Sequence, residues 1–237
     1  MDPSDTQQLA SLASLFQQTL NPEQRKAAEE QISQLQVQPY FVYLLLSLIQ
    51  SESASTAVRL AAAIQFKNIC KLRWVVDDES EEVVPNSVSD EEKYGIRQQL
   101  VPVLISLASA PSPSQAILSQ VNESIALVAS YDFPDAWPSL IDELVSQLST
   151  DNHHILLSVL STSHAIFKRW RSQFRSDALY MEINLVLGKM ANPLLELLQR
   201  MHSLLMDPST PSSTMQPLAM CLMLLLQLFY DLSAQDL

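Results

Sequence analysis

Apolar residues recur at intervals of three and four along almost the whole chain, and strict apolar–polar alternation is rare. This period is that of amphipathic helices rather than of strands. Prolines and short Ser/Asp/Asn clusters divide the pattern into ten segments. The predicted helices cover approximately residues 4–20, 21–35, 39–50, 55–74, 89–109, 112–131, 138–148, 152–171, 177–206 and 215–232.

Three of these helices begin with capping signals. In Asn21-Pro22-Glu23-Gln24, the asparagine is a suitable N-cap, the proline suits the first turn, and Gln24 is placed to close a capping box. Ser89 is followed three residues later by Glu92, and Ser112 by Gln115. The same signal therefore predicts helix starts at three separate points of the chain.

The ten helices form five consecutive pairs, each about 40 residues long, a period typical of α-solenoids. A local repeat agrees with this, because residues 25–28 and 59–62 both read R-x-A-A. The fold class predicted is all-α, an α-α superhelix. A globular bundle of ten helices is the alternative. Because the chain stops after a strongly apolar helix without a polar capping repeat, we expect a longer solenoid to continue beyond it.

Composition removes several classes of function. Only Gly95 and Gly188 are glycines, and no glycine-rich phosphate-binding motif is present. With 14 basic and 26 acidic residues, the net charge is −12, which disfavours nucleic-acid binding through a diffuse field. The two cysteines and four histidines lack the spacing of a metal site. We therefore expect a protein that is not an enzyme and needs no metal or cofactor.

Membrane and targeting signals are weak. The first 20 residues have neither the basic nor the apolar segment of a signal peptide. The longest apolar stretch, 218–230, is shorter than the roughly 18 residues that a membrane span requires. We interpret it as a helix that is buried on several sides.

Basic residues are concentrated in two short segments, each near the C-terminal end of the second helix of a pair. These segments contain seven of the 14: Lys67, Lys71 and Arg73, and Lys168, Arg169, Arg171 and Arg175. Helix dipoles favour cations at such positions, which is one explanation. The other is a basic ladder that faces a partner.

A stripe along residues 55–74 supports the second explanation. Arg59, Ala63, Lys67, Lys71 and Trp74 follow one another at intervals of three or four, so they share a helix face. Trp beside Lys and Arg is typical of interface anchors. The same residues could instead cover the core, with their charged ends in water.

An acidic segment separates the second and third helix pairs. Between residues 75 and 95 there are eight acidic residues and one lysine, which account for −7 of the net charge. Like charges repel and cannot bury apolar surface, so we expect residues 75–89 to be mobile and dispensable for folding. Electrostatic contact with a basic partner is the alternative role.

Several motifs, in this order, resemble the importin-β (karyopherin-β) superfamily. Residues 21–29 (N-P-E-Q-R-K-A-A-E) resemble its first repeat, residues 65–68 and 71–74 (Q-F-K-N and K-L-R-W) its second, and residues 131–138 (Y-D-F-P-D-A-W-P) its third. Four further segments resemble the branch of this superfamily that exports importin-α: residues 164–171, 174–176, 182–187 and 228–232. The acidic segment departs from the family pattern in length and composition.

The resemblance implies a HEAT-repeat solenoid with first helices outside and second helices inside. It implies that residues 1–237 are the N-terminal repeats of a longer karyopherin, with an importin-β N-terminal-type region at 22–100 that includes the acidic loop 75–89. Such exporters catalyse nothing. They bind Ran-GTP together with importin-α in the nucleus, pass the nucleoporins of the pore, and release both proteins in the cytoplasm after GTP hydrolysis.

The resemblance also indicates candidate binding residues. The second-repeat motif points to Lys67, Asn68, Lys71 and Trp74 as Ran-binding residues, with Arg25 and Arg59 in addition, so alanine at Lys67 and Trp74 is expected to weaken Ran-GTP binding. Three further residues are candidates for either Ran or cargo: Lys168, Arg169 and Arg171. For Phe133, Pro134 and Trp137 a structural corner is favoured.

Two other classes of function compete with an importin-α exporter. One is another Ran-dependent importin or exportin with a different cargo. The other is a HEAT-type scaffold, such as a phosphatase regulatory subunit or a clathrin-adaptor trunk. Such scaffolds lack the paired motifs at residues 66–74 and 132–138, so the sequence disfavours them.

Overall fold

The computed structural model describes residues 6–75 and 87–235, and in these residues it contains ten α-helices, one 3₁₀ helix and no strand. The chain divides into two compact units, the first formed by residues 1–107 and 114–124 and the second by residues 108–113 and 125–237. The acidic residues from Asp77 to Glu82 lie outside the described residues, so their predicted mobility stays a prediction.

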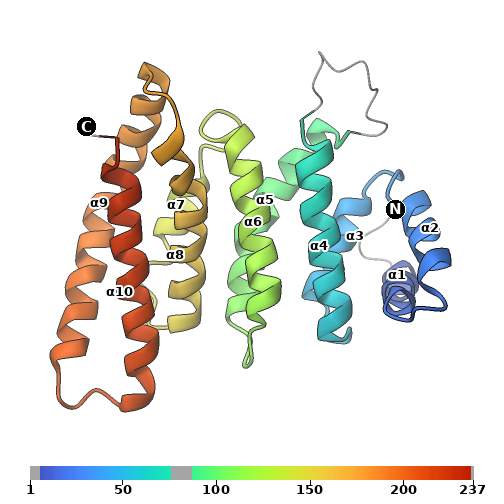
Figure 1. Cartoon of the computed structure of the whole chain (residues 1–237), viewed down its shortest axis with the longest axis horizontal. Helices are drawn as coiled ribbons and strands as arrows, with labels where there is room; N and C mark the ends of the chain where they lie inside the picture. The colour runs from blue at the N-terminus through green and yellow to red at the C-terminus, as the bar shows by residue number, and fades with distance from the viewer. Residues whose placement is uncertain (1–5, 76–86, 236–237) are drawn as a thin grey trace. The chain divides into compact units, whose positions relative to one another are not determined.

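The first unit contains α1 to α5 and the beginning of α6. Helix α3 is its core, because seven of its ten residues are buried, and it packs against α4, while α1 packs against α2 (Figure 1). The helices have these bounds: α1 Thr6–Thr19, α2 Arg25–Leu35, α3 Phe41–Gln50, α4 Thr56–Arg73, α5 Asp90–Ala108 and α6 Gln115–Asp132.

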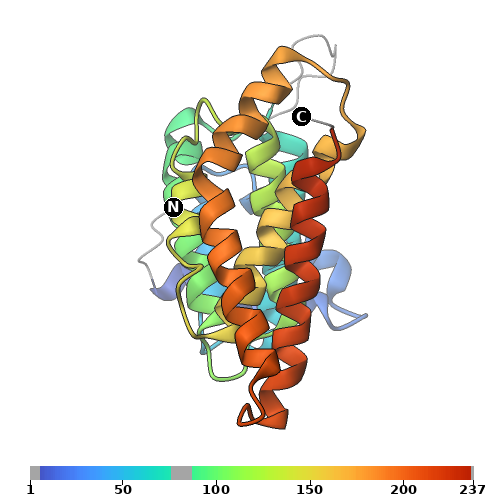
Figure 2. The same ribbon diagram turned by 90° about the vertical axis from the view of Figure 1, so that its left-hand side faces the viewer.

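The second unit contains the end of α6 and the remaining helices. Helices α9 and α10 lie side by side as a long hairpin (Figure 2), and α10 also packs closely against α8. The elements have these bounds: α7 Leu140–Val145, α8 His153–Phe167, the 3₁₀ helix η1 Lys168–Ser172, α9 Asp177–Met206 and α10 Ser212–Ser233.

The predicted capping boxes have different outcomes. At α5 the box is formed, since Ser89 Oγ donates to Glu92 Oε2 at 2.8 Å and accepts from the Glu92 N–H at 3.3 Å. At α2 the prediction is wrong. Asn21 Oδ1 accepts from the Glu23 N–H at 3.1 Å and so caps a preceding turn, while the helix begins at Arg25 without a side-chain cap.

The segment 132–138 forms the structural corner that the sequence favours. Phe133 and Trp137 are buried, and the Trp137 N–H donates to the Asp132 carbonyl at 2.9 Å. The Phe133–Pro134 peptide bond is cis. These side chains therefore pack the junction before α7 rather than facing a partner.

Helix α10 is longer than the apolar stretch seen in the sequence. It runs over 22 residues and is the one helix in the described part of the chain that is long and apolar enough to cross a membrane, which corrects the expectation that it is too short. It packs as a helix of the second unit, since Leu218, Leu225 and Leu228 are buried and its Asp231 is ion-paired. Core helices of folded domains meet the same length and composition criteria.

Candidate interaction surfaces

The predicted stripe on α4 does not form one surface. Trp74 is 1% exposed and Ala63 is also buried, so the prediction that Trp74 is an interface anchor is wrong. The exposed face is instead formed by Ile64, Asn68, Lys71 and Leu72 of α4, together with Val75, which follows two residues after the end of α4. Since each residue turns an α-helix by roughly 100°, this face is rotated by about a quarter of a turn from the predicted one.

Apolar side chains on the exposed face are a second difference from the sequence interpretation. Leu72 is 65% exposed and Val75 is 51% exposed. Lys71 and Asn68 lie beside them and are exposed, and Lys71 pairs with no acidic side chain among residues 6–75 and 87–235. The α4 face (Ile64, Asn68, Lys71 and Leu72 of α4, with Val75 just after it) therefore combines apolar area with a cation that has no acidic partner in the described part of the chain, as protein interfaces commonly do.

Lys67 belongs to the edge of this face and already has a partner. Its Nζ lies 2.8 Å from Glu123 Oε2 of α6, and both residues belong to the first unit. The Lys67 side chain is half-buried, whereas Glu123 is exposed. A protein that binds the α4 face must engage Lys67 together with Glu123 or displace that carboxylate.

Arg25 and Arg59 have structural roles. Arg25 Nε donates to the Thr19 carbonyl at 3.0 Å, at the end of α1, and Arg59 Nε donates to the Ile49 carbonyl at 2.8 Å, at the end of α3. The last carbonyls of a helix have no partner within it, so arginines stabilise these ends. As Ran-binding candidates, these two side chains already have their Nε–H groups engaged within the first unit.

The same device recurs at other helix ends. Arg73 Nη1 donates to the Gln36 carbonyl after α2 at 2.8 Å, and burial lowers the pKa of this arginine. Arg200 of α9 donates to the carbonyls of Leu148, Ser149 and Thr150, which follow α7. Much of the basic charge of the chain thus joins helices that are distant in sequence.

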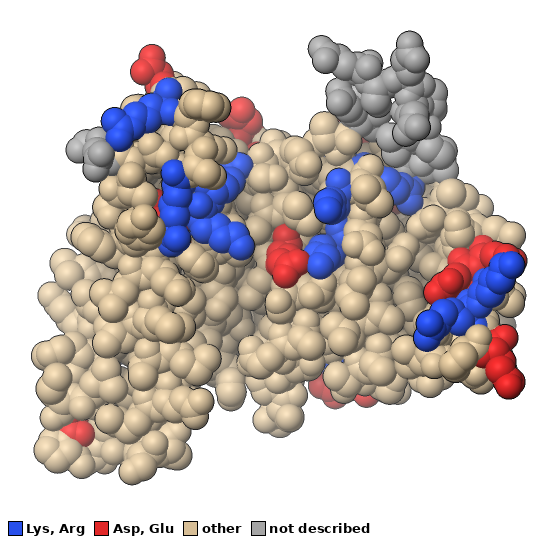
Figure 3. Space-filling view, viewed as in Figure 1, with Lys and Arg blue, Asp and Glu red and all other residues tan. Residues whose placement is uncertain are grey.

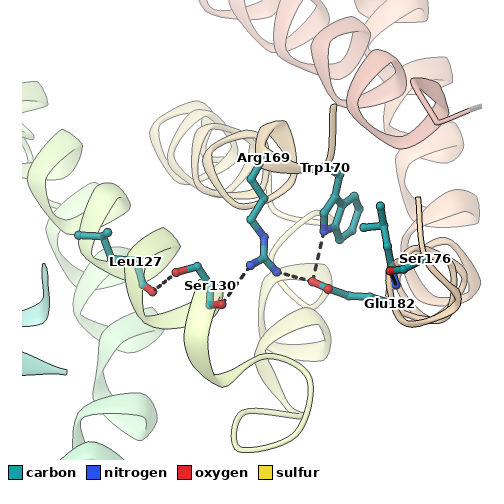
Figure 4. Close-up of polar contacts among 7 residues, drawn as sticks. Leu127, Ser130, Arg169, Trp170, Ser176 and Glu182 are labelled. Atoms are coloured by element: carbon teal, nitrogen blue, oxygen red, sulfur yellow. Dashed lines mark hydrogen bonds and ion pairs between the residues drawn. The ribbon is translucent and has the colours of Figure 1, made fainter. Parts of the chain in front are cut away.

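In the second unit, the three candidates for binding Ran or cargo all lie in η1, but their side chains have different contacts. They are Lys168, Arg169 and Arg171. Arg169 Nη1 donates to the Ser130 carbonyl at 3.1 Å, and Nη2 is paired with Glu182 of α9 (Figure 4). The Trp170 indole N–H donates to the same Glu182 oxygen at 3.3 Å. Arg169 therefore joins the end of α6, η1 and α9, and its guanidinium is engaged within the protein.

Arg171 and Lys168 lie on the other side of η1. Arg171 Nη2 is 2.5 Å from Asp231 Oδ1, and its guanidinium carbon lies 4.4 Å from the centre of the Tyr230 ring. Lys168 is exposed and pairs with no acidic side chain in the described part of the chain. Glu182, Tyr230 and Asp231 were noted in the sequence only as parts of family motifs, and spacing alone does not show that they meet η1.

Two of the three grooves found within the described part of the second unit are the larger ones. One, of about 770 Å³, runs between α9 and α10 and is lined by apolar residues such as Leu195, Leu226 and Phe229. The other, of about 620 Å³, lies beside the corner residues Pro134 and Asp135 and the start of α9. Among the described residues, no cluster of three or more His, Cys, Asp or Glu side chains is arranged to hold a metal ion.

Comparison with known proteins identifies the class. The importin-beta N-terminal domain family matches residues 28–106, and the Cse1 family matches residues 166–237. The solved structure described as the exportin Cse1 in its cargo-free, cytoplasmic state superimposes with a TM-score of 0.85 at 33% identity, over 96% of this chain and 24% of that one. The chain belongs to the importin-β superfamily, and the prediction of an all-α HEAT-repeat solenoid is confirmed.

Within that superfamily the chain is similar to importin-α re-exporters. The importin-alpha re-exporter of Schizosaccharomyces pombe is 35% identical over 226 residues, 95% of this chain and 22% of that protein. The importin alpha re-exporter of Saccharomyces cerevisiae is 35% identical over 228 residues, 96% of this chain and 23% of that protein. Exportin-2 of Homo sapiens is 32% identical over 240 residues, 100% of this chain and 23% of that protein. The chain thus spans less than a quarter of the length of these relatives.

Proposed function

We propose that the chain acts in nuclear export as part of an importin-α re-exporter that binds Ran-GTP. The similarity to importin-α re-exporters over nearly the whole chain carries this proposal. In this proposal, residues 1–237 are the N-terminal HEAT repeats of a longer karyopherin, which shuttles between nucleus and cytoplasm. It works by binding Ran-GTP, importin-α and nucleoporins, and it catalyses no reaction.

The α4 face is the proposed Ran-binding surface of the first unit. Its support is physical: Lys71 has no described acidic partner, and Leu72 and Val75 add exposed apolar area that a partner can bury. Asn68 supplies a hydrogen-bonding amide on the same face. Lys67 contributes from the edge of the face, in competition with Glu123. Trp74, Arg25 and Arg59 are left out because their side chains are used within the fold.

A receptor distinguishes GTP from GDP only by contacting the parts of the GTPase that differ between the two states. The experiment is therefore a pull-down with the chain as bait and Ran-GTP, Ran-GDP and importin-α as separate and combined prey. Binding of Ran-GTP but not Ran-GDP, strengthened by importin-α, is the expected result. Selective binding of Ran-GTP with no effect of importin-α would favour another Ran-dependent receptor.

The surface is tested with a Lys71→Glu/Leu72→Ser variant. Both residues are exposed, so the fold should be retained, and we expect Ran-GTP affinity to fall by about tenfold or more, as for an interface hot spot. The matched control is Lys26→Glu on α2, an exposed lysine away from α4. Equal affinities of the two folded variants, measured by titration calorimetry, would show that the α4 face does not bind Ran.

A further inference from the structure

Positive charge is segregated in one part of the second unit. Residues 152–176 contain four Lys or Arg, three His and no Asp or Glu, in a chain whose net charge is −12. Along α10 the one charged residue is Asp231, which is buried. Lys and Arg atoms gather accordingly at the upper left of Figure 3. This sequence segment therefore has a positive charge, although Glu182 and Asp231 pair with two of its four basic side chains, Arg169 and Arg171.

The 3₁₀ geometry of η1 decides which basic side chains share a surface. A 3₁₀ helix has three residues per turn, so side chains at i and i+3 lie above one another. Lys168 and Arg171 therefore lie on one face of η1, while Arg169 turns towards Ser130 and Glu182. Gln235 holds η1 in place by donating from Nε2 to the carbonyls of Trp170 and, at 3.2 Å, Gln173.

The buried carboxylate of Asp231 holds the Arg171 side chain in position. The Asp231 side chain has no solvent exposure and is paired with Arg171 Nη2 at 2.5 Å and with His164 Nδ1 at 2.7 Å. These contacts fix a long side chain that would otherwise lose rotamer freedom on binding a partner. The guanidinium lies over the Tyr230 ring, and 33% of the Arg171 side chain is accessible to solvent.

We propose that Lys168, Arg171 and Tyr230 form a binding patch for an acidic, carboxylate-rich segment of a partner protein. Arg171 has five N–H donors, and the ion pair with Asp231 involves one of its terminal nitrogens, so donors remain for a partner carboxylate. Lys168 adds a second positive charge, and Tyr230, which is 57% exposed, adds apolar area. Nucleic acid is the less suitable polyanion, because the net charge of −12 repels a long phosphate backbone more strongly than a short acidic segment.

As a partner surface of a transport receptor, the patch rests on the proposed function, but it belongs to the second unit, whereas the α4 face belongs to the first, and it is tested without Ran. The probe is a fluorescein-labelled octaglutamate peptide, titrated against the whole chain by fluorescence anisotropy at about 50 and 200 mM salt. We expect binding that weakens with salt. No binding at the lower salt, or tighter binding of a labelled dT12 oligonucleotide, would overturn the proposal.

Two exposed positions locate the binding. Lys168→Glu and Tyr230→Ala should each weaken peptide binding by about fivefold or more. The matched controls, Lys26→Glu and Tyr94→Ala, replace an exposed lysine and an exposed tyrosine of the first unit and should leave the affinity within about twofold. If the patch variants bind as tightly as the controls, the peptide binds elsewhere and the patch is rejected.

A third variant tests the role of the Arg171 geometry. Arg171→Ala would leave Asp231 buried without its arginine and would disturb folding, so Arg171→Lys is used, which keeps the charge but loses the planar fork. We expect peptide affinity to fall about threefold or more with unchanged circular dichroism. Wild-type affinity in Arg171→Lys would show that charge alone binds the peptide and that the preorganised guanidinium has no role.

Discussion

The two glycines of the chain have opposite local environments. At Gly95 of α5, an added Cβ would lie 1.9 Å from the hydroxyl oxygen of Tyr43, and that hydroxyl donates to the Glu92 carbonyl at 3.1 Å. At Gly188 of α9, an added Cβ would have no other atom within 4 Å, apart from its own chain neighbours and local helix backbone. A larger residue at position 95 therefore requires the Tyr43 side chain to shift, whereas Gly188 only reduces helix propensity.

Alanine substitution should separate the two cases. We expect Gly188→Ala to raise the free energy of unfolding by about 0.5–1 kcal/mol, because alanine loses less backbone entropy in a helix. Gly95→Ala should lower it by about 1–2 kcal/mol, because displacing Tyr43 costs packing and a hydrogen bond. Urea titrations of both variants check this, and a stabilised Gly95→Ala would show that Tyr43 moves aside without loss.

Residue roles were harder to predict from the sequence than residue types. The density of Lys and Arg near helix ends is visible in the sequence, but Arg59 and Arg73 donate to carbonyls at the ends of other helices, those of Ile49 and Gln36. Those acceptors are backbone carbonyl groups, which every residue type has, so the sequence does not show which residues accept these hydrogen bonds. Spacing could therefore indicate a basic cluster without showing which of its members remain available for a partner.

Helices, by contrast, follow closely from the pattern of apolar residues. The predicted helix at 177–206 coincides with α9, and the capping box at Ser89 marks the start of α5. The predicted stripe misplaces the buried face of α4 because it groups Ala63 and Trp74, which are both buried, with the charged residues. The apolar period predicts reliably that a helix exists. It predicts less reliably which way the side chain of a Trp at the end of that helix is oriented.

The junction of α3 with α5 is sensitive to pH through Tyr43. Burial, followed by the nearby charges of Glu92 and Glu91, raises the pKa of its hydroxyl above the ordinary value of 10.0. The folded state therefore favours the neutral hydroxyl. Its contribution to the free energy of unfolding is fully present below pH about 10 and is lost as the pH rises through the higher folded-state pKa.

Tyr43→Phe should remove this component of the pH dependence. We expect the wild type to lose more unfolding free energy than Tyr43→Phe between pH 9 and about 11, because only the wild type has the shifted hydroxyl. Unfolding by urea at several pH values in this range makes the comparison. Other titrating groups contribute equally to both proteins, so parallel pH profiles would contradict the assignment.

At the scale of the whole chain, each of the two compact units has its own set of buried residues. In repeat proteins, stability is carried by individual repeats and by contacts between neighbours, so a local defect is felt most strongly nearby. Replacing Trp74 would create such a local defect, since Trp74 is a large side chain of the first unit and is only 1% exposed.

Trp74→Ala should therefore affect the two units unequally. Removing a buried Trp side chain costs about 3–5 kcal/mol, and we expect amide exchange to accelerate by about a hundredfold or more in α3 and α4. In α8 and α10, which are joined by the His164–Asp231 contact, exchange should change by less than tenfold. Hydrogen–deuterium exchange with mass spectrometry measures both sets of peptides in one sample. Equal acceleration in the two units would show that they unfold as a single cooperative body, and no acceleration in α4 would mean that Trp74 contributes little to the core.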